Sequence, residues 1–271
     1  MRLSPDDAGL RRGDASHLTA AAGSGPDERT RPVETKIDEI APDVFRLSTI
    51  VPDAAPGGFG FNQFLVRDEQ PFLFHTGMRQ LYPLVSGAIA RIVPLADLRW
   101  ISFAHVEADE CGAMNLLLAD APRAEVVHGA LACMVSLNDL ADRPPQVIGD
   151  EILELGSHRL RFLPTPHVPH NWESGLWYDE TNNLLFAGDL LTQTGDGPAL
   201  TSDDLVEPAL RTEEIFHSTS LSANLVPTLE RLAQLQPTTL AVMHGSSFQG
   251  DGATALRALA AGYAATTAKA A

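Results

Sequence analysis

Histidine and carboxylate side chains gather directly after an apolar run in the segment FAHVEADECG, residues 103 to 112. The segment contains His105, Glu107, Asp109 and Glu110. In extended backbone, positions 105, 107 and 109 point to one side because successive side chains alternate. Buried charge without a partner is strongly unfavourable, so a charge of opposite sign must compensate it. Bound metal cations do this, and histidine and carboxylate are common metal ligands.

Three further apolar runs end in residues of the same types. His167 and His170 follow RLRFLPTP, Asp189 follows NLLFAG, and His244 follows TLAVM. Functional sites in α/β proteins form where strands end and loops begin. We therefore expect these side chains to meet the 103–112 segment at one edge of a sheet and to hold metal. A single histidine is more often an ordinary polar residue, and we assign no such role to His17, His158, His217 or His128.

The elements that must position these residues are recognisable from their periodicity. Helical spacing is found over residues 82–93, 112–122 and 224–235 and in the alanine-rich C-terminal segment. Short apolar runs typical of strands lie at 44–51, 62–67, 71–77, 98–105, 124–129, 158–167 and 238–245. Residues 174–189 predict two strands around an Asn-containing turn. Because strands alternate with helices and a hairpin is present, we predict a mixed α/β (α+β) layered fold.

The composition excludes several classes of function. The chain has 271 residues, 44% of them hydrophobic, which suits one large domain or two small ones with a sizeable core. Its formal charge of −16 repels phosphate backbones, so nucleic acid is not an expected partner. No apolar run reaches the length of a membrane span, and the first residues do not form a secretory signal. We expect a cytoplasmic protein that does not associate with membranes.

Residues 1 to 34 differ from the rest of the chain in composition and in apolar periodicity. They are rich in Asp, Arg, Gly, Ser, Thr and Pro and show no sustained apolar period, as is typical of a disordered tail. We predict a disordered tail over 1–34 and one domain over 35–271. The two cysteines, Cys111 and Cys133, are too few for a disulfide framework or a CxxC metal clamp.

The ordered motifs HxExDE, TPHxPH, FAGD and MHG resemble those of the metallo-β-lactamase superfamily, whose usual first motif is HxHxDH. The glutamate at position 107 makes the chain similar to the diiron branch, namely the metal-binding domain of flavodiiron proteins and the single-domain oxygen-binding diiron proteins. The segments HTG at 75–77 and ADECG at 108–112 are closer to the single-domain relatives. The resemblance runs from about residue 36 to about residue 250. It implies an αββα sandwich, with two mixed sheets between helices and a binuclear site at one edge.

The resemblance also implies a ligand set that two irons share: His105, Glu107 and His167 on the first, Asp109 and His244 on the second, and Asp189 as the bridge. Glu110 stands where the family motif has a histidine for the second iron. We count Glu110 among the expected metal ligands, with contact through water or a turn away from the metal as alternatives. His170 is the nearby candidate to replace a ligand or to donate a hydrogen bond to one. His75 is expected to orient a carboxylate rather than to bind metal.

The donor types favour iron independently of the resemblance. Hard anionic oxygen donors favour iron or manganese over zinc, although zinc and manganese remain alternatives. Four carboxylates, Glu107, Asp109, Glu110 and Asp189, balance the charge of two divalent ions. The charge on the segment after residue 103 is thus tolerated because metal compensates it.

Three functions are compatible with such a centre. The leading hypothesis is a non-haem diiron protein that binds dioxygen or nitric oxide and reduces it. Flavodiiron enzymes receive electrons from an attached FMN domain, but this chain ends at Ala271, so we expect no FMN here. It also lacks the CxxC pair of a rubredoxin. We therefore expect an external flavin or rubredoxin-type reductase. A gas sensor without turnover is the second hypothesis. The third is a hydrolase that uses a metal-bound hydroxide on an ester, thioester or lactone. A homodimer is expected by analogy only.

Overall fold

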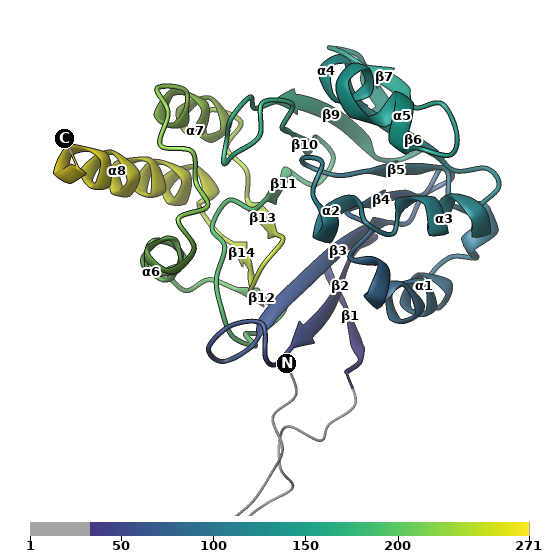
Figure 1. Cartoon of the computed structure of the whole chain (residues 1–271), viewed down its shortest axis with the longest axis horizontal. Helices are drawn as coiled ribbons and strands as arrows, with labels where there is room; N and C mark the ends of the chain where they lie inside the picture. Colours follow the sequence, from purple (N-terminus) through teal and green to yellow (C-terminus); the bar gives the residue numbers. More distant parts are fainter. Residues whose placement is uncertain (1–32, 271) are drawn as a thin grey trace, which may run out of the picture. The chain divides into compact units, whose positions relative to one another are not determined.

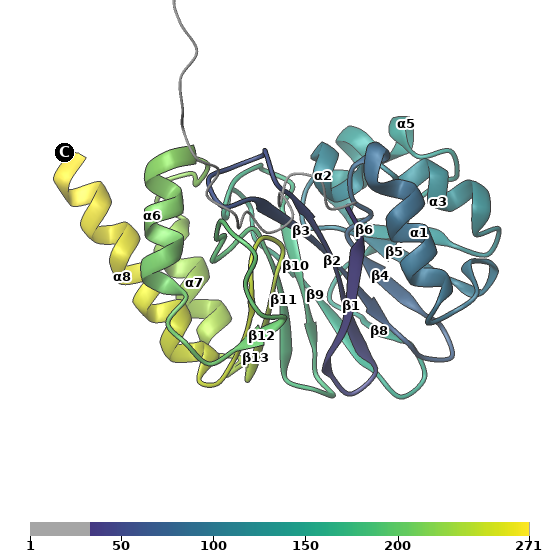
Figure 2. The same ribbon diagram turned by 90° about the horizontal axis from the view of Figure 1, so that it is seen from below.

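Two seven-stranded β-sheets pack face to face in the computed structural model, which describes residues 33 to 270 (Figures 1 and 2). One group of helices covers the outer face of the first sheet, and the three helices nearest the C-terminus cover the outer face of the second (Figure 2). This arrangement confirms the predicted αββα sandwich of two mixed sheets. The predicted tail, residues 1 to 34, lies outside the described residues except for positions 33 and 34.

The first sheet is built from strands in their order along the chain: β1 (Thr35–Ala41), β2 (Val44–Val51), β3 (Phe59–Val66), β4 (Phe72–Phe74), β5 (Trp100–Ser102), β6 (Glu125–Gly129) and β7 (Gln146–Ile148). Strands β1 to β4 pair antiparallel, whereas β4 to β7 pair parallel. The carboxyl ends of β4, β5 and β6 therefore lie at the same edge, where the polar residues after β5 begin.

The second sheet contains the remaining strands, β8 (Ile152–Glu154), β9 (Arg159–Pro164), β10 (Gly175–Asp179), β11 (Leu184–Gly188), β12 (Leu200–Thr201), β13 (Thr239–Val242) and β14 (Ser247–Gln249). Their spatial order is β12-β14-β13-β11-β10-β9-β8. Strands β11 and β13 run parallel, as do β12 and β14, and the other neighbours are antiparallel. The parallel pair β11 and β13 brings Asp189 and His244 to the same edge of this sheet.

The helices form the two outer layers. Beside the first sheet lie α1 (Tyr82–Ala90), α2 (Ala108–Cys111), α3 (Met114–Asp120), α4 (Ala130–Ala132) and α5 (Asn138–Leu140), with short turns η2 (Arg79–Leu81) and η3 (Leu95–Asp97) and the π-helical η4 (Cys133–Leu137). Beside the second sheet lie α6 (Val206–Phe216), α7 (Leu225–Ala233) and α8 (Gly252–Ala270) (Figure 1). No helix of the described residues is long and apolar enough to cross a membrane.

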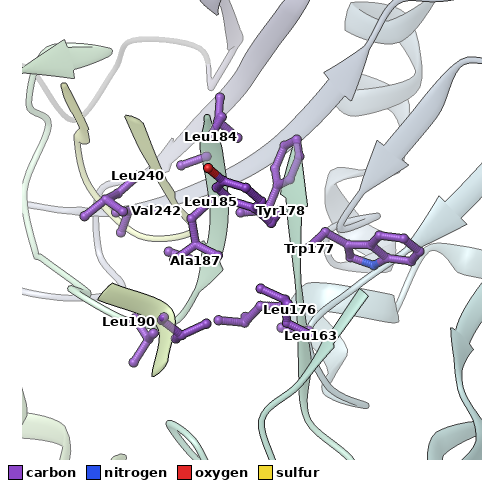
Figure 3. Close-up of a cluster of buried hydrophobic side chains, with 14 of the residues drawn as sticks. Leu163, Leu176, Trp177, Tyr178, Leu184, Leu185, Ala187, Leu190, Leu240 and Val242 are labelled. Carbon is purple, nitrogen blue, oxygen red and sulfur yellow. The ribbon is translucent and has the colours of Figure 1, made fainter. Parts of the chain in front are cut away.

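The strands at the centre of the second sheet are buried on both faces. Every residue of β10 and β11 is buried, because the first sheet covers one face and α7 and α8 cover the other. Trp177 of β10 donates a hydrogen bond from its indole N–H to Ser102 Oγ of the first sheet at 2.8 Å. Figure 3 shows Trp177 and Tyr178 with the apolar side chains of the neighbouring strands. This packing supports β11, which ends directly before Asp189.

Most of the elements expected from periodicity are present, with shifts of a few residues at their ends. Strand β2 matches the run at 44–51, and the helix expected over 82–93 ends at Ala90. The strands β1, β7, β8, β12 and β14 and the helix α6 were not predicted. Strands β7, β8, β12 and β14 have two or three residues each, and α6 buries only Ala209 and Thr212, so their apolar patterns are weak.

A buried ion pair fixes the turn between β8 and β9 to the end of β10. His158 Nδ1 lies 2.9 Å from Asp179 Oδ2, and both side chains are buried. The hydrogen bond from His158 to Asp179 raises the pKa of His158, although burial opposes the shift. His158 was expected to be no more than an ordinary polar residue, and the structure gives it this structural contact.

This pair predicts a pH-dependent stability. A histidine whose pKa is raised on folding stabilises the folded state below its unfolded pKa, about 6.5, and this contribution is lost as the pH rises through the folded pKa. We expect His158→Asn to lower the free energy of unfolding by about 1 to 3 kcal/mol at pH 6 and by less at pH 9. Denaturant unfolding at both pH values measures this. The exposed His217→Asn serves as the control, and an effect of His158→Asn that does not change with pH would contradict the prediction.

Candidate metal centre

Four loops from the two sheets meet at one edge of the molecule. They follow β5, β9, β11 and β13 and carry His105, His170, Asp189 and His244 respectively. Each loop begins at the end of a strand that places side chains in the core, so the backbone that carries each site residue is anchored on one side. Residues that lie as much as 139 positions apart along the chain thus share one site.

The first group consists of His105, Glu107, His170 and Asp189, from each of which one ligand atom lies within 4.8 Å of the others. His105 Nε2 is 2.8 Å from Glu107 Oε2 and 2.8 Å from His170 Nε2. His170 Nε2 is 3.6 Å from Asp189 Oδ2. Ligand atoms bound at about 2.1 Å to one ion lie about 3.0 to 3.4 Å apart. The spacing of these donors therefore fits a single metal ion at their centre.

A second group adjoins the first and shares Asp189 with it. His244 Nε2 lies 3.2 Å from Asp189 Oδ1 and 3.4 Å from Asp109 Oδ2. Asp189 thus directs Oδ2 toward the first group and Oδ1 toward the second. A carboxylate with one oxygen on each side is the arrangement that a bridging ligand requires.

The charges at the site are arranged to receive cations. Burial lowers the pKa of His105, but Glu110, Glu107 and Asp189 outweigh this effect and raise it to about 10. Burial likewise lowers the pKa of His244, but Asp109 and Asp189 raise it to about 10. Hydrogen bonds from His105 and His170 lower the pKa of Glu107 to about 2. The carboxylates therefore stabilise positive charge on the imidazoles, and bound metal ions supply the same positive charge.

The row expected at positions 105, 107 and 109 is divided between the two groups. Glu107 is extended, with φ −136° and ψ 156°, but α2 begins at Ala108 and turns the chain. The prediction of a continuous extended row was therefore wrong. Because of this turn, Asp109 faces His244 instead of pointing to the same side as Glu107.

The structure brings His170, and not His167, to the first group. The side chain of His167 is exposed, and its backbone is left-handed, with φ 65°. The backbone N–H of His167 donates to the Asn171 carbonyl oxygen at 2.8 Å, which closes a tight loop. The loop carries His170 Nε2 to 3.1 Å from Glu107 Oε2. His167, expected as a ligand of the first iron, therefore lies apart from the other donors, and His170 stands in its place.

Glu110 lies behind His105 and does not line the cavity beside the ligand atoms. It is fully buried, and its Oε2 accepts a hydrogen bond from the His105 backbone N–H at 2.6 Å. Its Oε1 is 3.3 Å from His105 Nδ1 and 3.4 Å from His75 Nε2. Burial raises the pKa of Glu110 to about 8, although His105 opposes this. His75 contacts this carboxylate, as expected, whereas the expected position of Glu110 beside the second metal is not observed.

Residues of the first sheet hold the loop that carries His244. Asn62 Nδ2 donates to the carbonyl oxygens of Val242 at 2.8 Å and Gly245 at 2.9 Å. The buried guanidinium of Arg46 donates to the same Gly245 oxygen at 2.9 Å. His244 Nδ1 is 2.8 Å from the Gly60 carbonyl oxygen, so its Nε2 faces the carboxylates. Sequence reasoning missed Asn62 and Arg46, although polar residues within apolar strands are a signal for such a role.

Gly188 is required directly before Asp189. Its φ is +52°, and a Cβ at this position would lie 2.9 Å from the Ala104 Cβ and 3.2 Å from Leu176 Cδ2. A larger residue would therefore displace β11 from its neighbours and move Asp189.

A cavity of about 260 Å³ opens beside the two groups. Its lining comprises Phe59, Glu107, Asp109, His170, Asp189, Thr192, Phe216, Ser218 and His244. The ring of Phe59 stacks on His244, with 4.3 Å between centroids, and Phe61 meets the same imidazole edge-on at 5.3 Å. The segment GGFGF, residues 57 to 61, thus supplies an aromatic wall beside His244.

The fold is of the metallo-β-lactamase type, and its donors form two adjoining groups that share Asp189. The chain belongs to the family described as ODP family beta lactamase, whose model matches residues 59–245. This membership confirms the resemblance inferred from the motifs.

Several sequence relatives carry flavoprotein or oxidoreductase names, and solved structures share the fold. A Synechocystis protein named diflavin flavoprotein A 2 is 27% identical over 201 residues, which are 71% of this chain and 34% of the relative. The rubredoxin-oxygen oxidoreductase of Megalodesulfovibrio gigas is 24% identical over 207 residues, or 72% of this chain and 51% of the relative. A metal-soaked flavodiiron core from Synechocystis superposes with a TM-score of 0.77 at 22% identity and covers 88% of this chain and 63% of that one. The chain thus spans about a third to a half of these curated relatives.

The two histidines of the TPHVPH segment provide a matched test of the site. We expect His170→Ala to bind at least one metal ion fewer per chain than the wild type, because its Nε2 lies among the donors of the first group. His167→Ala should retain the wild-type number, because its side chain is exposed. Metal analysis after anaerobic reconstitution with Fe²⁺ measures both, with circular dichroism as the check on folding. Loss of metal in His167→Ala alone would show that the loop rearranges on metal binding.

Proposed function

We propose that this chain holds two iron ions and reduces dioxygen or nitric oxide with electrons from a separate donor. The observation that carries the proposal is the position of Asp189 between two sets of donors, with His105, Glu107 and His170 on one side and Asp109 and His244 on the other. When bound, the iron pair supplies the redox chemistry that activates the gas.

The donor set supports iron over zinc. Glu107, Asp109 and Asp189 face the site, and Glu110 lies directly behind it, so four carboxylates accompany three histidines. Hard oxygen donors suit iron or manganese, and four negative charges match two divalent ions. The names of the relatives, which include a rubredoxin-oxygen oxidoreductase, agree with a redox function.

The size and walls of the cavity support a small ligand. At about 260 Å³ the cavity lies below the usual range of about 300 to 1,000 Å³ for organic ligands. The rings of Phe59 and Phe216, whose centroids are 5.5 Å apart, form an apolar wall on one side of the cavity. Ser218 also lines the cavity. These features favour a gas over an ester, thioester or lactone.

Electrons must come from outside the described residues, and the surface near the site supports docking of a donor. Phe216 lines the cavity and is 42% exposed. Trp172, two residues after His170, is 53% exposed. Exposed aromatic side chains of this kind are enriched where proteins associate. A flavin or rubredoxin-type reductase bound here would bring its redox group close to the metals.

The proposal predicts iron binding and gas consumption that depend on Asp189. We expect the protein, purified anaerobically and loaded with Fe²⁺, to bind two irons and to develop a new charge-transfer absorption when oxygen or nitric oxide is admitted. With NADH and a reductase it should consume the gas catalytically, as followed with a gas electrode. Asp189→Ala should lose at least one iron and most of this consumption, because it removes a donor from both groups.

The other outcomes separate the alternatives. Gas binding without consumption in the presence of the reductase would indicate a sensor. Two zinc ions with turnover of an ester, thioester or lactone would indicate a hydrolase. Either result would overturn the proposed reduction.

A further inference from the structure

We propose that Glu110 positions His105 for the first metal ion instead of binding the second, and that the two metal positions therefore differ in affinity. The inference rests on the proposed binuclear site and deepens it. In the family motif, a histidine at this position binds the second metal ion. Glu110 instead has a positioning role.

The first observation is the contact geometry of Glu110. One carboxylate oxygen accepts the His105 backbone N–H at 2.6 Å, and the other lies 3.3 Å from Nδ1 of the same residue. Glu110 is fully buried and lies on the side of the imidazole opposite Nε2. Glu110 Oε1, His105 Nδ1 and His75 Nε2 are all buried without a hydrogen-bond partner, and Oε1 lies 3.3 Å from His105 Nδ1 and 3.4 Å from His75 Nε2.

The second step follows from the chemistry of imidazole. His105 Nε2 faces Glu107 and His170, so this nitrogen must keep its lone pair in order to bind a metal ion. The proton then resides on Nδ1, and Glu110 Oε1 is positioned to accept it in a hydrogen bond. Carboxylates that accept this proton from a ligating histidine fix its tautomer and ring orientation and raise its basicity. Glu110 thus belongs to the first metal position, although it does not touch the metal.

The two metal positions have different numbers of donor residues. The first position has four donor residues, His105, Glu107, His170 and Asp189. At the second position, Asp109 and His244 are joined only by the shared Asp189. Glu110 is absent from the cavity beside these residues. Fewer protein donors leave more coordination positions open to solvent, so we expect the second ion to bind more weakly and to exchange more readily than the first.

The test is an anaerobic Co²⁺ titration of the full-length apoprotein, followed by visible absorption. Wild type should show two phases that differ by at least tenfold in affinity. His170→Ala identifies the phase of the first position by removing it, and Asp109→Ala identifies the second in the same way. Glu110→Gln must place an amide NH₂ either against the His105 backbone N–H, which Oε2 accepts, or against Nδ1, which Oε1 faces at 3.3 Å. We expect it to weaken the first phase by about 10- to 100-fold and to leave the second unchanged.

Glu173→Gln provides a matched control. Glu173 is also buried, and its Oε1 accepts the Val106 backbone N–H at 3.1 Å, but no imidazole contact is recorded for it among the described residues. It should keep both phases. A Glu110→Gln variant that weakens the phase assigned by Asp109→Ala would overturn the proposal, as would two wild-type phases of equal affinity.

A structure of the Co²⁺-loaded wild type tests the proposal without any variant. A Glu110 oxygen at about 2.2 Å from an ion would make it a ligand and refute the positioning role. The wild type could also bind a single ion that His170→Ala loses and Asp109→Ala retains. This result would support the proposal, because the second position would then have too low an affinity to fill. Failure of the gas chemistry would leave two unequal Co²⁺ phases intact, so the two proposals fail independently.

Discussion

The Asp189 carboxylate joins the two halves of this site, and every other feature of the edge depends on its charge being compensated. One oxygen faces His105 and His170, and the other faces His244. Asp189 is only 15% exposed, and a carboxylate with so little access to water is costly unless positive charge lies beside it. Here imidazoles from three separate loops approach it, and the lowered pKa of Asp189, to which His244 contributes, reflects this. A bound cation on each side would satisfy the same requirement with greater charge.

The layered fold holds these groups within reach of one another. Asp189 follows β11, whose residues are all buried between the first sheet and the helices. His244 follows β13, and Asn62 of the first sheet ties that loop to the opposite layer. Because these contacts cross the interface between the sheets, the site depends on how the sheets pack as well as on each loop. Such support from rigid elements preorganises a metal site.

The two histidines His105 and His244 have different neighbours on the side away from the other donors. His75 and Glu110 form a buried layer beneath His105, while Phe59 and Phe61 hold the imidazole of His244 from the other side. One histidine is therefore supported by a carboxylate and the other by aromatic rings and the Gly60 carbonyl oxygen. The two halves of the site therefore differ in the groups that surround their histidines.

The sequence by itself determined the donor types, their order and the fold class, because buried strands leave apolar runs and their ends leave polar residues. It also indicated the supporting role of His75. It did not reveal Asn62 or Arg46 as supports for the His244 loop, nor distinguish His170 from His167, which stand three residues apart in one motif. Only the tertiary structure decided that point, because a left-handed residue at 167 turns the loop and periodicity does not extend into loops. The direction of Glu110 was decided in the same way, since α2 begins at Ala108 and turns its side chain beneath His105.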